Sequence, residues 1–133
     1  MKKLIRITGL LLVAGLMAVG TESCYKKKDT IAEVFVRNEA GAPIPGARVR
    51  MFGESSLQDQ QAGEIILDDT RFTDGNGRAV FDYSGYFKAG QAGFAVLSVE
   101  ISKALPPPDE DLFLKTIMKI EPEITNVEVY VLE

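Results

Sequence analysis

The chain has 133 residues and a formal net charge of −4, with one cysteine and neither histidine nor tryptophan. The missing histidine excludes Ser-His-Asp and Cys-His catalysis and histidine-containing zinc sites, and the single cysteine excludes an intramolecular disulfide. A negative chain has no general attraction for phosphate backbones, so we expect no nucleic-acid partner. Only carboxylates, lysine or tyrosine are left for chemistry, and we expect no catalytic site and no cofactor.

The chain begins with the pattern of an export signal. Lys2, Lys3 and Arg6 precede an apolar run at residues 10–20. Eleven residues at about 1.5 Å each cover far less than the roughly 30 Å core of a bilayer, which is typical of a signal peptide and not of a membrane-spanning helix. We therefore expect a helical signal peptide at residues 1–23, a tether at 24–29 and one domain at 30–133.

The residues around Cys24 resemble the lipobox of bacterial lipoproteins, in which a small residue such as Ser23 directly precedes the cysteine. In that family the cysteine is acylated and becomes the new N-terminus. The resemblance implies that Cys24 carries palmitate-type chains that anchor the protein in a lipid bilayer. The family prefers an aliphatic residue where Thr21 stands and a small residue where Glu22 stands. Cleavage after Gly20 by ordinary signal peptidase is the alternative, and it would leave Cys24 as a free thiol.

The tether that follows is polar, and residues 25–29 read Tyr-Lys-Lys-Lys-Asp. Such a tether is similar to those of Bacteroidetes lipoproteins, where acidic residues after the cysteine mark proteins displayed on the cell surface. Lysines near a charged membrane favour anionic head groups by about 1 kcal/mol each. The lysines here favour a protein anchored in the outer membrane of the cell envelope and facing the periplasm.

The rest of the chain alternates apolar and polar residues with a period of two, between clusters of turn residues. Residues 93–102 are the most apolar segment and are expected to form a central strand. The spacing predicts an all-β fold of seven or eight strands, an antiparallel sandwich or barrel. We expect a single antiparallel β-sandwich. The predicted strands are residues 30–37, 47–52, 64–67, 71–73, 78–83, 93–102, 112–120 and 125–132, and the predicted loops are 53–63 and 105–111.

Two segments together resemble the carboxypeptidase regulatory-like domains, which are transthyretin-like relatives of the immunoglobulin-type sandwiches. Residues 41–49 read Gly-Ala-Pro-Ile-Pro-Gly-Ala-Arg-Val, and residues 73–81 read Thr-Asp-Gly-Asn-Gly-Arg-Ala-Val-Phe. The resemblance covers residues 32–83, and the last third of the chain matches only as generic strands. Domains of this family accompany enzymes, transporters and adhesins, which implies a non-catalytic interaction or scaffold module.

Oxygen-bearing side chains gather at Asp68, Asp69, Asp74 and Asn76, and such side chains suit calcium. Their spacing does not provide the ligand positions of an EF-type loop. The alternative, which we favour, is that they are turn residues of a hairpin around residues 74–77, where Asp-Gly and Asn-Gly pairs accommodate a positive φ.

A second candidate site is aromatic. Tyr83, Tyr86 and Phe87 flank Ser84 and Gly85 and are interpreted either as a platform for a glycan or peptide or as half-buried aromatics at a strand end.

Two functions follow from the sequence. The first is a membrane-anchored envelope lipoprotein whose sandwich is a non-catalytic module for an envelope protein partner, contacted along a sheet edge or through the loops at 53–63 and 105–111. The alternative is a ligand-binding lipoprotein for calcium, a peptide or a carbohydrate, which would use the 68–76 region or the aromatics at 83–87.

Overall fold

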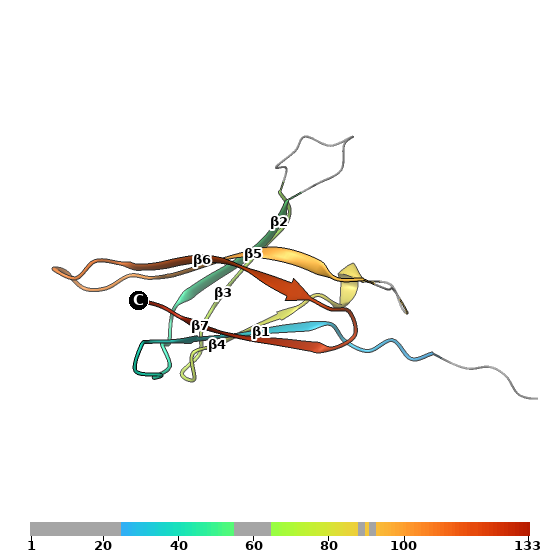
Figure 1. Ribbon diagram of the computed structural model, residues 1–133, viewed down its shortest axis with the longest axis horizontal. Coiled ribbons are helices and arrows are strands. Elements are labelled where there is room, and N and C mark those ends of the chain that lie inside the picture. The colour runs from blue at the N-terminus through green and yellow to red at the C-terminus, as the bar shows by residue number, and fades with distance from the viewer. Residues whose placement is uncertain (1–24, 55–64, 88–89, 91–92) are drawn as a thin grey trace, which may run out of the picture.

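A computed structural model describes residues 25–54, 65–87, 90 and 93–133. The predicted signal peptide, Cys24 and most of the predicted loop at 53–63 lie outside these residues. Within them the chain forms seven strands and one short 3-10 helix (Figure 1). The elements are β1 (Ile31–Arg37), β2 (Arg48–Glu54), β3 (Ile65–Phe72), β4 (Arg78–Asp82), η1 (Ser84–Tyr86), β5 (Ala95–Lys103), β6 (Leu112–Ile120) and β7 (Thr125–Val131).

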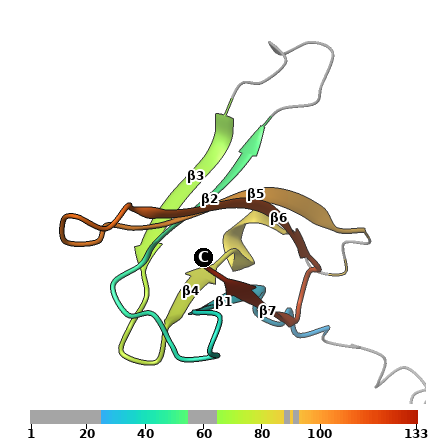
Figure 2. The same ribbon diagram turned by 60° about the vertical axis from the view of Figure 1, so that its left-hand side comes forward.

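The strands form two sheets, one with the order β4-β1-β7 and the other with the order β3-β2-β5-β6. Figures 1 and 2 show them as two layers, with the four-stranded sheet above the three-stranded one. The predicted all-β class is therefore confirmed. The apolar segment at 93–102 was predicted to be central, and β5 does lie between β2 and β6.

The pairing of β1 with β7 is parallel, whereas every other strand pair is antiparallel. The prediction of a wholly antiparallel fold is wrong at this pair. The reason lies in the turn between β6 and β7, which carries the chain from one sheet to the other. Because β7 then starts at the same end of the molecule as β1, the two strands run in the same direction (Figure 1).

Strand β3 also differs from the prediction, because residues 65–67 and 71–72, which belong to two separate predicted segments, are parts of one strand. In the sequence, the intervening polar residues indicate a break between two strands. In the structure they pair with β2 without interruption, as in Asp68 opposite Phe52 and Thr70 opposite Arg50. Pairing with β2 thus keeps this segment in a strand, although its residues have a low intrinsic preference for strands.

Alternation along the strands builds the core from both sheets. Ala47, Val49 and Met51 share the inner face, and all three are completely buried. Phe81 of β4 also reaches the core. The valines of β7 at 127, 129 and 131 share a face as well, but that face is the outer, exposed one.

Hydrogen bonds join the segments at 41–49 and 73–81. Thr73 is the centre of this network, because its backbone amide donates to the Ala47 carbonyl and its carbonyl accepts from the Gly46 amide, both at 2.9 Å. Its hydroxyl accepts from the Ala47 amide at 2.8 Å and donates to the Ile44 carbonyl at 2.7 Å. We call this end of the molecule, comprising residues 38–47, 73–77 and 104–111, the turn end.

Candidate binding pocket

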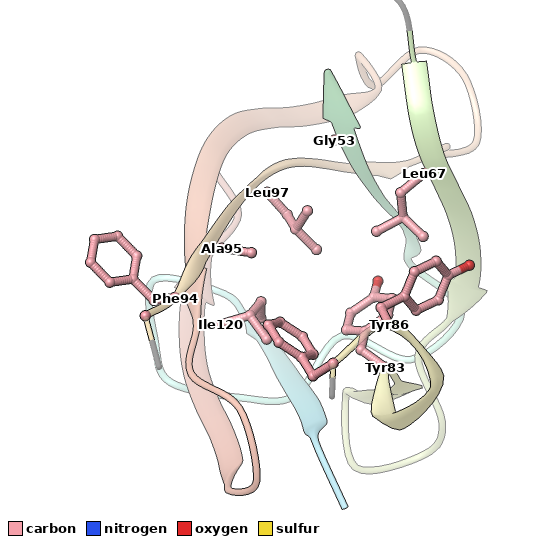
Figure 3. A pocket seen from close by; sticks show the side chains of 10 residues that line it. Gly53, Leu67, Tyr83, Tyr86, Phe94, Ala95, Leu97 and Ile120 are labelled. Atoms are coloured by element: carbon pink, nitrogen blue, oxygen red, sulfur yellow. The ribbon is translucent and has the colours of Figure 1, made fainter. Parts of the chain in front are cut away.

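The opposite end of the sheets, where β1 begins and β4 ends, contains a pocket of about 330 Å³ (Figure 3). We call residues 25–30, 83–87, 93–95 and 120–124 the pocket end. One part of the pocket wall is aliphatic and consists of the strand residues Leu67, Leu97 and Ile120. Aromatic side chains form the rest of the wall. None of the described residues that line the pocket carries a formal charge.

The aromatic wall follows from the strand that precedes it. Alternation along β4 continues past its end, so that Ala79, Phe81 and Tyr83 all point inward. The rings of Phe81 and Tyr83 stack at 6.0 Å between centroids. The backbone amide of Tyr83 donates to the Thr30 carbonyl at 2.8 Å, which fixes the chain against the start of β1.

The helix η1 then turns the chain back over this wall. The Asp82 carboxylate accepts from the Ser84 amide at 2.9 Å, and the Tyr86 amide donates to the Tyr83 carbonyl at 2.9 Å. The turn brings the Tyr86 ring edge-on to that of Tyr83, with 5.9 Å between centroids. Tyr83 is therefore buried, while Tyr86 stays exposed at the rim.

The space beside these rings is open because small residues line part of it. Gly53 and Ala95 also line the pocket, at the two ends of β2 and β5 that face it. Neighbouring inward positions on the same strands carry Met51 and Leu97, which fill the interior. The pocket thus arises where bulky inward residues give way to small ones at one end of the sheets.

The Tyr83 hydroxyl is the polar feature of the pocket. The residue is 2% exposed, and its hydroxyl has no hydrogen-bond partner among the described residues. Figure 3 shows the hydroxyl pointing into the pocket, toward the side on which Leu67 and Leu97 lie. A buried hydroxyl without a partner costs about 1–3 kcal/mol. Such groups are rare in native proteins and call for an explanation.

Burial is also the main cause that raises the pKa of Tyr83, and the negative charge of Asp69 raises it further. The hydroxyl is therefore protonated at neutral pH and can donate a hydrogen bond. An apolar pocket with one buried donor suits a ligand that is neutral, mostly apolar and equipped with one acceptor oxygen.

The candidate calcium ligands do not converge. Asp68 and Asp69 are consecutive in β3 and so point to opposite faces of the sheet. Asp68 accepts both arms of the Arg50 guanidinium, at 2.9 and 2.7 Å, and this contact lowers the pKa of its carboxyl. Asp69 lies 3.5 Å from the Arg71 side chain.

The other two candidates belong to the turn end. The Asp74 carboxylate accepts from the backbone amides of Asn76 and Arg78 at 2.9 and 3.1 Å, so it caps its own turn. In the described part of the chain, no three acidic, histidine or cysteine side chains come together as metal binding requires.

The predicted loop at 105–111 lies at the turn end and closes on itself, because the Asp111 carboxylate accepts from the Leu105 amide at 3.1 Å. A second hollow, of about 420 Å³, lies at the same end beside the exposed residues 38–40. Among the described side chains, no buried polar atom without a partner faces it.

The aromatic trio at 83–87 does border one site, but as the wall of a pocket. Reasoning from the sequence missed Leu67, Leu97 and Ile120, which the pairing of distant strands brings to the same place. A local signal existed only for the small residues Gly53 and Ala95, which interrupt the bulky inward series of β2 and β5.

No protein-family model matches the chain, and no curated protein is significantly similar to it. Over the residues that the structure describes, no helix is both long and apolar enough to cross a membrane.

Proposed function

We propose that the chain is an envelope lipoprotein, anchored through acylated Cys24, whose two-sheet domain binds a neutral and largely apolar ligand. The observation that carries the binding role is the buried Tyr83 hydroxyl, which has no partner among the described residues and points into an apolar pocket. A ligand oxygen that accepts from this hydroxyl would offset the cost of burying it. The described lining residues favour binding over catalysis, because none of them titrates near neutral pH.

The anchor rests on the export pattern and on Ser23-Cys24, and the proposed location is the periplasmic side of the outer membrane. The tether at residues 24–29 extends at most about 20 Å, so the domain stays close to its anchor. We further propose that the domain is of the carboxypeptidase regulatory-like, transthyretin-related type. The hydrogen bonds that join its two characteristic segments through Thr73 support this assignment.

A protein partner is the second candidate function, and β7 favours it. This strand lies at the edge of its sheet and exposes three valines on its outer face, at 127, 129 and 131. An edge strand of this kind can pair with a strand of another protein. Crosslinking in the native envelope from position 129 tests the idea, and recovery of no envelope protein would count against it.

The pocket is tested with octane and 1-octanol, which differ by one hydroxyl. The core residues that the structure describes all lie between 32 and 132, so residues 25–133 carry them and are used in solution. We expect octanol to bind about twofold to twelvefold more tightly than octane, because one hydrogen bond contributes about 0.5–1.5 kcal/mol. Tyr83→Phe should remove the difference, and equal binding of the two molecules by the wild-type domain would contradict the proposal.

The anchor is tested separately by palmitate labelling of the full chain. Wild type should incorporate the label and Cys24→Ala should not. Cleavage after Gly20, with Cys24 recovered as a free thiol, would contradict the lipoprotein assignment.

A further inference from the structure

The tether lies against the pocket end of the domain. The Tyr25 hydroxyl donates to the Glu123 carboxylate, and the backbone amide of Lys28 donates to the same carboxylate at 3.2 Å. The Lys27 ammonium group donates to the backbone carbonyl of Ser84, in η1. The segment that follows Cys24 is therefore held on the β6–β7 turn and on the helix that borders the pocket.

The β6–β7 turn is shaped for this contact. Glu123 has a φ of 62°, in the left-handed region that side chains other than glycine rarely adopt. Its backbone amide donates to the Thr30 hydroxyl at 2.8 Å, which holds this conformation. The hydrogen bond from Tyr25 is the main cause that lowers the pKa of Glu123. Strained residues are retained where a function depends on them, and here the strain presents a carboxylate to the tether.

Exposed apolar side chains surround the same end. Phe94 is 61% exposed and Ile124 is 45% exposed, and Tyr86 and Tyr25 are exposed as well. They come from four different segments of the chain, and Phe94 and Tyr86 also line the pocket. Aromatic residues with one polar end, such as tyrosine, are enriched at membrane interfaces, where ring and hydroxyl can meet different surroundings.

We propose that the pocket end of the anchored domain rests on the bilayer that holds Cys24, with Phe94, Tyr86 and Ile124 in the interface and the pocket open toward the lipid. The proposal rests on the acylation of Cys24. Cys24 is bonded to Tyr25, so its lipid starts about 3.8 Å, one Cα–Cα step, from a residue held on the β6–β7 turn. The pocket then receives its ligand from the bilayer, and the ligand class is a membrane-dissolved lipid.

The opposite end of the domain lies well away from this surface. Phe113, which pairs with Ser102, is separated from Phe94 by eight residues along β5. At about 3.4 Å per residue that is roughly 27 Å, close to the thickness of a bilayer core. The two phenylalanines are equally exposed, 61% for Phe94 and 60% for Phe113, so they form a matched pair.

The test uses the full lipidated chain in phosphatidylcholine vesicles, with and without dibromo-phosphatidylcholine as a quencher within the acyl region. Because the chain contains no tryptophan, Phe94→Trp and Phe113→Trp each introduce a single tryptophan, whose emission is followed. We expect the emission at position 94 to shift to shorter wavelength and to be quenched at least threefold more strongly than at position 113. Equal quenching at both positions would overturn the proposed orientation.

A second pair of tryptophan variants keeps the test decisive if a variant of the first pair fails to fold. Ile124 and Val131 are each 45% exposed, and they lie just before and at the end of β7. Ile124→Trp should be quenched like Phe94→Trp, and Val131→Trp like Phe113→Trp. Mass spectrometry of the same samples reports the acyl chains on Cys24. Missing acyl chains would overturn the anchor, whereas acylated protein with equal quenching would overturn the orientation alone.

Discussion

The two ends of the domain differ in how completely their polar groups are paired. At the turn end, the buried hydroxyl of Thr73 both donates and accepts, and Asp74 caps its own turn. At the pocket end, the buried hydroxyl of Tyr83 has no partner among the described residues, and Glu123 sits in a strained conformation. Proteins depart from full pairing mostly at functional sites, where stability is lost for the sake of function. The turn end therefore stabilises the fold, while the pocket end is built for binding.

Gly77 gives the largest expected effect. Its φ is 71°, and a Cβ atom there would lie 2.5 Å from the Val36 carbonyl oxygen and 3.1 Å from the Ile44 amide nitrogen. Both the conformation and the contact with rigid backbone exclude a side chain. We expect Gly77→Ala to lower the free energy of unfolding by about 3 kcal/mol or more, measured by urea denaturation followed with circular dichroism.

Gly75, two residues earlier in the same turn, is the matched control. A Cβ atom there would meet nothing within 4 Å. Gly75→Ala should change the free energy of unfolding by less than about 0.5 kcal/mol. Similar losses for the two variants would show that the close approach at Gly77 is not what stabilises the turn end.

Thr73 gives the next largest effect. Thr73→Val keeps the shape of the side chain but leaves the buried Ala47 amide and Ile44 carbonyl without the hydroxyl that pairs them. We expect a loss of about 1–3 kcal/mol in the same urea experiment. Thr73→Ser keeps the hydroxyl and should lose clearly less. If serine and valine were equally harmful, packing of the methyl group would be the cause.

The turn end could be predicted from the sequence because its geometry depends on local residues. Glycine, proline and aspartate at 41–46 and 73–77 require turns wherever the flanking strands lie. The alternation of Ala47, Val49 and Met51 with two arginines also lies within one segment, and it is enough to place the three on one face.

The pocket end could not be predicted in the same way. Its walls come from β3, β5, β6 and the segment after β4, which only the pairing of distant strands brings together. The parallel β1–β7 pair depends on a change of sheet at residues 121–124, which alternation does not report. The continuity of β3 depends on pairing with β2, and Arg50 of that strand holds the Asp68 side chain.

Tyr83→Phe should have the opposite sign from Thr73→Val. It removes a buried hydroxyl that has no partner, so we expect the free energy of unfolding to rise by about 1 kcal/mol at pH 7. Above pH 10 the difference in the free energy of unfolding between the variant and wild type should widen, because burial raises the pKa of Tyr83 in the folded protein above its ordinary value of 10.0. The unfolded chain then loses the proton first, and wild type loses about 1.4 kcal/mol of stability per pH unit that the variant keeps.

Tyr130 is an internal control for this measurement. Burial raises its pKa to about 12, but it is present in both proteins, so its contribution cancels in the comparison. Urea denaturation at pH 7, 10 and 11 supplies the required values. A loss of stability at pH 7 on removing the hydroxyl would mean that Tyr83 is paired after all, and the distinction between the two ends would fail.

Glu123→Gly should have the smallest effect on stability and a clear effect on the tether. Glycine adopts a φ of 62° without strain, so the free energy of unfolding should rise, by less than about 1 kcal/mol. Loss of the carboxylate frees the Tyr25 hydroxyl and the Lys28 amide, so trypsin should cleave after the tether lysines several times faster. Glu121→Gln is the control, because Glu121 lies on the same turn but its side chain pairs with Lys119 of β6. If both variants were cleaved equally fast, Glu123 would not hold the tether on the pocket end. The structural reason for that end to face the membrane would then be lost.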